Sequence, residues 1–341
     1  MKTVTIRVPA TSANLGPGFD TIGLSLDFYD ELTVCWGTGT LLEHRAVEVS
    51  GPFSDVPVDE TNMVYAIIKS ELLHAGFPEV EFAISCINNI PHARGLGSSS
   101  AAICSALQAA SIVLNDVSDG EITWSKNYIY DKALAIEGHG DNVAPCIFGG
   151  IQLVTKSRPG HFPLFLRSDY AYDAFSIRYH IFDEPTKTSD ARNALPKEID
   201  RLQAVENSAN VAELVTAFSM LKTPDNHVLQ LGRNYTRNIN EMLFFGTEDH
   251  IHQDFRQSVY PESLDRVKKL RGASIPAAIS GAGSTIIAFW FDERRFEGLD
   301  GHDDFWTAQA IGARYDKFIE ENKSPSWEIK KGTIGVGCSV V

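Results

Sequence analysis

Basic residues are scarce in this sequence, which has 30 Lys and Arg against 44 Asp and Glu and a formal net charge of −14. Because such a charge repels the phosphates of nucleic acids and anionic membrane surfaces, neither is an expected partner. The five cysteines are odd in number and widely spaced, and no CxxC pair or His/Cys cluster offers a zinc site. The N-terminus also lacks an apolar run long enough for a signal peptide or a membrane span. These absences predict a cytoplasmic protein with reduced thiols.

The length and composition are those of a soluble globular protein. The chain has 341 residues, of which 43% are hydrophobic and 22% charged, so it is long enough for two domains that each bury a core. Pro159, Gly160 and Pro163 lie together near the middle and mark a plausible boundary. We therefore expect one domain over residues 1–160 and a second over 161–341.

Hydrophobic periodicity predicts a mixture of strands and helices. Residues 4–8 alternate between apolar and polar side chains, and residues 61–75 have apolar side chains at helical spacing, with Thr61 as a candidate N-cap. The remaining predicted strands cover 32–36, 81–87, 175–182, 277–280, 285–291 and 332–336, and the remaining predicted helices cover 99–114, 128–137, 196–221, 226–246 and 263–270. A short helix or turn is expected to enter a strand within 146–154. The mixture predicts an α+β fold.

The densest motif is the segment Pro91-His92-Ala93-Arg94-Gly95-Leu96-Gly97-Ser98-Ser99-Ser100-Ala101, between a predicted strand and a predicted helix. Glycines let the backbone turn tightly with its N–H groups exposed, and the helix that follows directs its positive end to the same point. The segment therefore suits an anion. A seryl hydroxyl in it either caps the helix or holds Mg²⁺, and a purely structural Gly/Ser cap stays open. It is neither a Walker A loop nor a Rossmann fingerprint.

Three segments in a fixed order resemble the motifs of the GHMP kinases. The glycine segment is similar to the phosphate loop of that family, residues 9–20 (PATSANLGPGFD) resemble its first motif in the form found in homoserine kinases, and residues 279–285 (ISGAGST) resemble its third. The resemblance implies a two-domain GHMP kinase fold, with an N-terminal domain like ribosomal protein S5 domain 2 and a ferredoxin-like C-terminal domain. The active site would lie between them.

The same resemblance implies where ATP and Mg²⁺ bind. It puts Asn62 near the adenine and the loop residues Pro91, Arg94, Gly95, Leu96, Gly97, Ser98 and Ser99 around the triphosphate. It also implies two Mg²⁺ ligands, Ser99 and an acidic residue eight positions before His139. That position holds Asp131 where the family usually has Glu, so a slip in the alignment or an exposed surface Asp stays open.

The acceptor site implied by the resemblance suits a small zwitterion. Arg192 and Arg256 would bind the carboxylate, since an Arg fork can meet both carboxylate oxygens, and Thr188 would be a further substrate-binding residue. Asp20, with Asn14 nearby, would meet the ammonium group. Residues 137–145 (EGHGDNVAP) are similar to a homoserine kinase signature, with Gly140 where Pro is common. His139 and Asn142 would contact the substrate, Asn142 at the acceptor hydroxyl.

The predicted activity is transfer of the γ-phosphate of ATP to the side-chain hydroxyl of L-homoserine, giving O-phospho-L-homoserine for threonine biosynthesis. Positioning and electrostatics are expected to supply most of the catalysis, with Ser99, His139, Asn142 and Arg192 as the reacting-centre residues and without an assigned general base. A mevalonate-type kinase and a non-catalytic ATP sensor are the alternatives. An RNA-binding role is disfavoured by the net charge. The resemblance also implies a homodimer.

Overall fold

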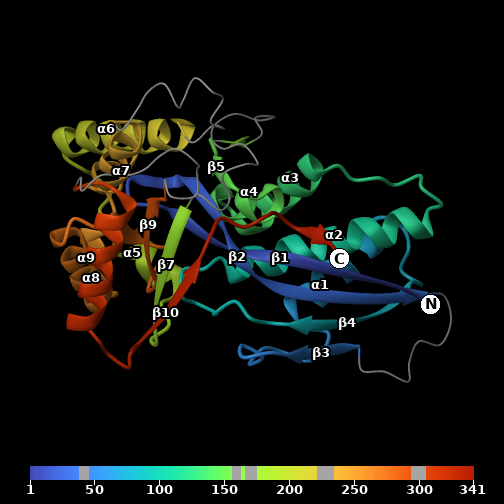
Figure 1. Cartoon of the computed structure of the whole chain (residues 1–341). Coiled ribbons are helices and arrows are strands. Elements are labelled where there is room, and N and C mark those ends of the chain that lie inside the picture. Colours follow the sequence, from blue (N-terminus) through green and yellow to red (C-terminus); the bar gives the residue numbers. More distant parts are fainter. Residues whose placement is uncertain (38–45, 156–162, 166–174, 221–233, 293–304) are drawn as a thin grey trace.

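The structure is a computed structural model that describes residues 1–37, 46–155, 163–165, 175–220, 234–292 and 305–341. Two β-sheets, each covered by helices, lie at opposite ends of the molecule (Figure 1). The first sheet has the order β11-β1-β2-β4-β3, and β5 and β6 extend it beside β2. Its strands are β1 (Lys2–Asn14), β2 (Gly18–Gly37), β3 (Val47–Ser50), β4 (Glu81–Ile87), β5 (Ile151–Leu153), β6 (Leu164–Phe165) and β11 (Ser339–Val340).

A long antiparallel hairpin of β1 and β2 forms the spine of this sheet. Side chains that alternate along it, such as Ile6, Val8 and Val34, are fully buried, because one face of the sheet is covered by helices. The hairpin turns at Gly16, whose φ of +92° favours glycine. A Cβ there would lie 2.3 Å from the carbonyl oxygen of Thr247, so the tip of the hairpin packs directly against the second half of the chain.

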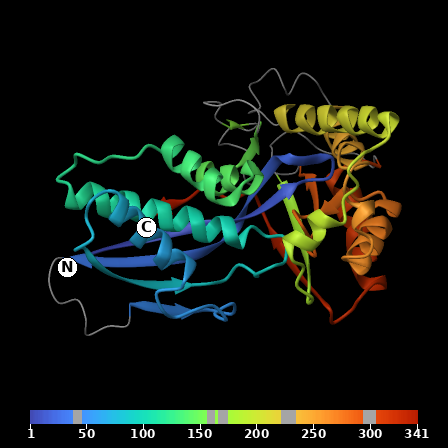
Figure 2. The ribbon, with the colours of Figure 1, turned by 180° about the vertical axis from the view of Figure 1, so that it is seen from behind.

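Four helices cover the first sheet: α1 (Met63–His74), α2 (Ser98–Val117), α3 (Lys126–Glu137) and α4 (Gly140–Phe148) (Figures 1 and 2). Helix α1 is capped by Asn62, whose side-chain oxygen accepts a hydrogen bond from the Val64 N–H at 3.0 Å. The predicted cap Thr61 is wrong by one residue, since Thr61 bonds to Asp59 instead. Among the described helices, α2 alone is long and apolar enough to cross a bilayer, yet most of it is buried in this core.

The second sheet is antiparallel, in the order β10-β7-β9-β8. It contains β7 (Phe175–Phe182), β8 (Ala277–Ile279), β9 (Ile286–Phe291) and β10 (Trp327–Gly332). Around it lie α5 (Thr188–Asn193), α6 (Arg201–Met220), α7 (Asn234–Gly246), the short 3₁₀ helix η3 (Asp254–Arg256), α8 (Pro261–Gly272) and α9 (Ala308–Glu321). The last residues of the chain return to the first sheet as β11, beside β1. These two layered halves confirm the predicted α+β class.

Several predicted elements differ from the structure. The strand expected over 332–336 is wrong, because β10 ends at Gly332 and only single bridges follow, from Ile334 and Val336. Strand β3 and helices α5 and α9 had no prediction, although α9 buries Ala308, Ile311, Tyr315 and Phe318 at helical spacing. The part of the predicted 226–246 helix before Asn234 lies outside the described residues, as does the predicted domain boundary at Gly160, which stays a prediction.

Candidate active site

The glycine loop runs from the end of β4 to the start of α2. Gly95 and Gly97 have φ values of +73° and +69°, and a Cβ on them would lie 2.1 Å from the Ser280 carbonyl oxygen and 1.9 Å from Thr11 Oγ1, respectively. Both positions therefore need glycine for backbone conformation and for space. Because Ser280 and Thr11 belong to the other two motifs, the loop is the point where all three segments meet.

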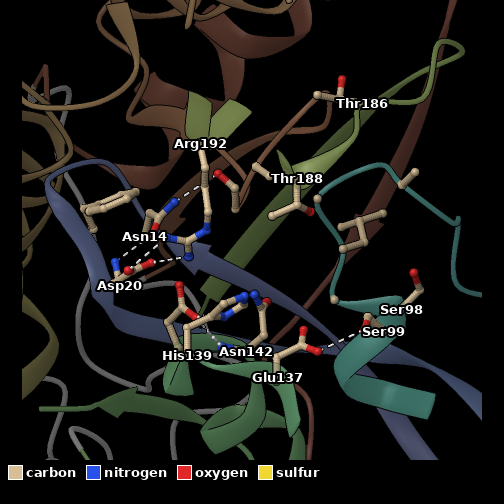
Figure 3. A pocket seen from close by; sticks show the side chains of 18 of the residues that line it. Asn14, Asp20, Ser98, Ser99, Glu137, His139, Asn142, Thr186, Thr188 and Arg192 are labelled. Carbon is tan, nitrogen blue, oxygen red and sulfur yellow. Dashed lines mark hydrogen bonds and ion pairs between the residues drawn. The ribbon is translucent and has the colours of Figure 1, made fainter. Parts of the chain in front are cut away.

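Two cavities open from this loop and share Ser98 and Ser99 as lining residues. The larger, of about 440 Å³, lies between the first sheet and the N-terminal ends of α1 and α2, and we name it the first cavity. The second cavity, of about 270 Å³, lies where α3, α4 and the hairpin tip meet α5 and the loop after β8. Figure 3 shows it with Asn14 and Asp20 at one side and Ser98 and Ser99 at the other. This arrangement suits a donor and an acceptor that meet at the start of α2.

Asn62 lines the first cavity, as predicted, but its side chain is committed to the protein. Its Oδ1 caps α1, and its Nδ2 donates to the Pro57 carbonyl at 2.8 Å. Next to Asn62, the wall of the first cavity is apolar and is formed by Pro57, Met63 and Val64. Asn62 therefore shapes the wall of this cavity by holding the 57–62 segment to the helix.

The predicted triphosphate residues divide into two groups. Gly95 and the four residues that follow it, through Ser99, line the second cavity, with Ser98 and Ser99 also in the first. Pro91 and Arg94 line neither. The Arg94 guanidinium donates to the carbonyl of Phe182 at 2.8 Å and also to that of Asp183, so it fastens the loop to the end of β7. The resemblance implies that Pro91 and Arg94 lie around the triphosphate, but neither side chain lines a cavity.

The carboxylate beside Ser99 is Glu137, whereas the predicted metal pair joins Ser99 to Asp131. Glu137 accepts hydrogen bonds from Ser99 Oγ at 3.0 Å and from Ser100 Oγ at 2.8 Å. Asp131 lies six residues earlier on α3, is exposed, and lines neither cavity. Glu137 stands at the start of the 137–145 motif but received no role, because the expected acid was eight residues before His139. Its place at the C-terminal end of α3, closed by Gly138, turns it toward α2.

Ser99 and Glu137 form an oxygen donor pair that fits Mg²⁺, which prefers hard oxygen ligands and keeps substrate and water oxygens in its other positions. Among the described residues, no group of three or more His, Cys, Asp or Glu side chains forms a metal cluster. The pair therefore suits a metal that arrives with a nucleotide.

Asp20 and Arg192 face the second cavity as an ion pair. Arg192 Nη2 and Nη1 lie 2.8 Å and 3.2 Å from the two carboxylate oxygens of Asp20, a bidentate geometry. Asp20 raises the pKa of Arg192 above its ordinary value. The Asp20 N–H donates to Asn14 Oδ1 at 3.1 Å, and Asn14 Nδ2 donates to the Gly281 carbonyl at 2.9 Å. The structure thus brings the predicted Asn14, Asp20 and Arg192 together.

Arg256 supplies a second cation to the same cavity although its side chain is almost fully buried. Its Nε donates to the Ala191 carbonyl at 2.9 Å, and its Nη1 donates to His252 Nδ1 at 3.2 Å. His252 Nε2 donates to the Gly16 carbonyl at 2.7 Å, and burial lowers the pKa of His252. The guanidinium carbons of Arg256 and Arg192 lie 5.4 Å and 5.7 Å from the centre of the Phe19 ring.

His139 and Asn142 form the wall below these charges (Figure 3). His139 Nδ1 lies 2.8 Å from Asp141 Oδ1, and this hydrogen bond raises the pKa of His139 against the opposing effect of burial. A Cβ on Gly140 would lie 2.6 Å from the Tyr130 hydroxyl, so the space at this position suits glycine. Predicted Thr188 also lines this cavity, and so does Thr186, which sequence reasoning missed.

Comparisons with known proteins agree with this geometry. The model of the GHMP kinases N terminal domain matches residues 62–150. The homoserine kinase of Streptomyces coelicolor is 35% identical over 312 residues, 91% of each chain, and that of Cutibacterium acnes is 36% identical over 292 residues, 84% of this chain and 88% of its own. The crystal structure of homoserine kinase from Cytophaga hutchinsonii superposes with a TM-score of 0.71 at 26% identity, covering 100% of this chain and 98% of that one.

The chain belongs to the homoserine kinases of the GHMP family. Its membership confirms the two-domain GHMP kinase fold inferred from the three motifs. It also makes the chain an ATP-dependent phosphotransferase with a hydroxyl group as acceptor. In a homoserine kinase, the residues that line the two cavities suit one to ATP and the other to the acceptor.

Proposed function

We propose that the chain transfers the γ-phosphate of ATP to the side-chain hydroxyl of L-homoserine, giving O-phospho-L-homoserine for threonine biosynthesis. One observation carries this proposal: Asp20, Arg192 and Arg256 face a small cavity that meets the phosphate loop at Ser98 and Ser99. At the end of the cavity where Asp20 pairs with Arg192, near Arg256, an anion and two cations match an acceptor that carries both an ammonium and a carboxylate group. The names of the relatives support the same acceptor.

The two ends of homoserine would take different partners in the second cavity. The carboxylate would bind Arg256 and Arg192, and the ammonium group would bind Asp20. Because Asp20 and Arg192 already pair at 2.8 Å, the zwitterion exchanges one charge pair for two, and no charge is left unpaired. Thr188 lines the same end. Mevalonate lacks the ammonium group, so it could not form the new ion pair with Asp20, and Arg192 would remain the only charged partner of Asp20.

The phosphate loop and the start of α2 supply the electrostatics for transfer. Backbone N–H groups between Gly95 and Ser99 and the positive end of a 20-residue helix face the junction of the cavities. ATP would occupy the first cavity with its phosphates at this junction. Ser99 and Glu137 would hold Mg²⁺, which when bound would neutralise phosphate charge. Asn142 would hold the acceptor oxygen, and catalysis would rest on positioning.

The alternatives lose support at two places. The ATP-sensor reading rested on Asp131 in place of Glu, and Glu137 beside Ser99 removes that argument. The mevalonate-type reading does not explain an aspartate in the acceptor cavity. We extend the proposal to a cytoplasmic homodimer. The net charge of −14 disfavours a nucleic-acid or anionic membrane partner.

The test is ADP release from purified protein with Mg²⁺-ATP and, in turn, L-homoserine, mevalonate, galactose, L-serine or no acceptor. Turnover confined to L-homoserine supports the proposal. Turnover with mevalonate keeps the phosphotransferase and overturns the acceptor. Silence with every acceptor, together with ATP binding, favours the sensor reading.

A further inference from the structure

Thr11, in the first motif, contacts both the phosphate loop and Asn142, and no role has been assigned to it. It lies in β1 and is fully buried. Its N–H donates to the Leu96 carbonyl at 3.0 Å, within the phosphate loop. Its hydroxyl donates to Asn142 Oδ1 at 2.8 Å. A residue in the first strand is therefore tied to the loop and to the residue that would hold the acceptor oxygen.

Close packing leaves this hydroxyl no room to move away. A Cβ on Gly97 would lie 1.9 Å from Thr11 Oγ1 and 3.2 Å from Asn142 Oδ1. Because Gly97 has no side chain, the Thr11 hydroxyl and the Asn142 Oδ1 atom can lie together beside its backbone. Threonine in a strand also has few χ1 rotamers, so the hydroxyl stays where the neighbouring strand and loop place it.

This contact decides which face of the Asn142 amide the cavity meets. An amide has an acceptor oxygen at one corner and a donor NH₂ group at the other. In the structure Oδ1 accepts from the Thr11 hydroxyl, so the oxygen corner of the amide is engaged inside the protein. Asn142 lines the second cavity (Figure 3), and the corner it has left for a ligand is the donor Nδ2.

We propose that Thr11 is a positioning residue, whose hydroxyl fixes the Asn142 amide so that Nδ2 donates to the acceptor oxygen of the substrate. The proposal rests on the kinase activity proposed above. A donor at that oxygen holds a lone pair of the hydroxyl and directs the other lone pair toward the γ-phosphate. Asn142 oriented in this way cannot accept the hydroxyl proton, so it acts by orientation alone.

A double-mutant cycle separates this role from simple packing. The variants are Thr11→Val, which keeps the shape and removes the donor, Thr11→Ser, which keeps the donor, Asn142→Ala, and Thr11→Val with Asn142→Ala. Thr5→Val is the matched control, because Thr5 lies in the same strand and its hydroxyl bonds to Thr33 at 3.0 Å, away from the site. Each variant is assayed for kcat and for both KM values with the acceptor that the wild type turns over fastest.

Thr11→Val is expected to lower kcat about 10-fold, the equivalent of one hydrogen bond, with the KM for ATP changed less than about twofold. Thr11→Ser should retain most of kcat, and Thr5→Val all of it. In the Asn142→Ala background, Thr11→Val should have no further effect, because Thr11 acts through Asn142. A further 10-fold loss there, or an unchanged kcat in Thr11→Val alone, would overturn the proposal.

A measurement without turnover keeps this inference separate from the substrate assignment. The side-chain NH₂ resonances of Asn142 in ¹⁵N-labelled protein can be identified by their disappearance in Asn142→Ala. Thr11→Val should shift or broaden them, whereas Thr11→Ser and Thr5→Val should not. If Thr11→Val leaves these resonances unchanged, Thr11 does not orient the amide, whatever the acceptor proves to be.

Discussion

Two clusters of titratable side chains, one at the cavity and one in the second sheet's core, show what distinguishes a site from a core. The cavity cluster contains Asp20, Arg192, Arg256, His139 and Asp141, of which Arg256 and Asp141 are buried and the others are partly exposed. The core cluster contains His180 of β7, Arg266 of α8 and Tyr315 of α9, all buried between the second sheet and its helices. Taking such groups out of water is costly unless each is paired.

The clusters differ in how their atoms are used. In the core cluster, Arg266 Nε donates to His180 Nδ1 at 2.8 Å, and His180 Nε2 lies 2.8 Å from the Tyr315 hydroxyl, so both ring nitrogens are engaged. Arg266 stacks over Trp327 at 4.9 Å and has no carboxylate partner in the part of the chain that is described. None of these residues lines the two cavities. In the cavity cluster, oppositely charged groups pair at an open wall where a ligand can reach them.

The difference teaches that polar side chains inside a protein indicate a functional site only where some of their charged or hydrogen-bonding atoms face a cavity. The two histidines make the point sharply. A carboxylate partner raises the pKa of His139, whereas burial, reinforced by Arg266 and Arg178, lowers the pKa of His180 to about 3. Substitutions in the cavity cluster should therefore change turnover, and those in the core cluster should change stability.

The largest effect is expected at Glu137. Glu137→Gln should lower kcat about 10²- to 10³-fold and raise the Mg²⁺ concentration needed for half-maximal rate, because a neutral amide is a poorer ligand than a carboxylate. Initial rates across a Mg²⁺ titration measure both. Asp131→Asn on the same helix is the control and should behave as wild type. A normal Mg²⁺ response in Glu137→Gln, with a defect in Asp131→Asn, would restore the original sequence assignment.

A smaller effect is expected at the paired arginine. Arg192→Ala should raise the KM for L-homoserine roughly 30-fold, since it removes one of the two cations that would bind the carboxylate. The KM for ATP should change little, because Arg192 does not line the first cavity. Arg192→Lys should lie between, as lysine cannot make both bonds to Asp20. Arg201→Ala, at an exposed position on α6, is the matched control.

An equal rise in the KM values for ATP and for L-homoserine in Arg192→Ala would show that the two cavities do not separate donor from acceptor.

Arg256→Ala should raise the KM for L-homoserine and also lower the thermal midpoint of unfolding, since the Arg256 guanidinium is buried and bonded to Ala191 and His252. An unchanged midpoint would contradict the structural part of this account.

A different kind of effect is a pH dependence of stability that differs between the two histidines. Below pH 6.5 the unfolded chain protonates His180 and the folded chain does not, so stability should fall by roughly 1.4 kcal/mol per pH unit from about 6.5 toward 3. His139 has the opposite sign: its stabilising pair with Asp141 is present below pH 6.5 and weakens as the pH rises through its raised pKa. NMR titration of the ring protons measures both.

In that titration His139 should change charge above pH 6.5, and His180 should stay neutral at pH 5. Asp141→Asn should lower the pKa of His139 and leave His180 unaffected. Titration of His180 near 6.5 would contradict its place in the core cluster. His180→Gln should flatten the fall of the thermal midpoint between pH 6.5 and 5, even if its stability at pH 7 is lower.

The sequence predicted the cavity cluster better than the core cluster. Motifs around Asn14, Gly95, His139 and Arg256 are short and keep their order, so the residues that meet at the site could be named before the fold was known. Glu137 was missed because its role depends on how α3 ends at Gly138 and faces α2, which no spacing rule supplies.

The core cluster could not be predicted, because it joins residues of β7, α8 and α9 that carry no motif. Helix α9 went unrecognised despite its periodic apolar side chains, and the pairing of Asp20 with Arg192 spans 172 residues. The core cluster forms only when the second sheet packs against its helices, and the Asp20–Arg192 pair forms only when the hairpin tip meets α5. Local pattern therefore indicated which residues bind, and tertiary packing decided how they are paired.

The most direct test of the central claim is ³¹P NMR of a reaction that contains the protein, Mg²⁺-ATP and L-homoserine as the sole acceptor. We predict that the γ-phosphate signal of ATP is replaced by those of ADP and of a phosphomonoester, whose ³¹P resonance is split into a triplet by one CH₂ group. Release of inorganic phosphate alone, or an unchanged ATP spectrum while mevalonate is phosphorylated in a parallel tube, would contradict the claim that the second cavity takes homoserine.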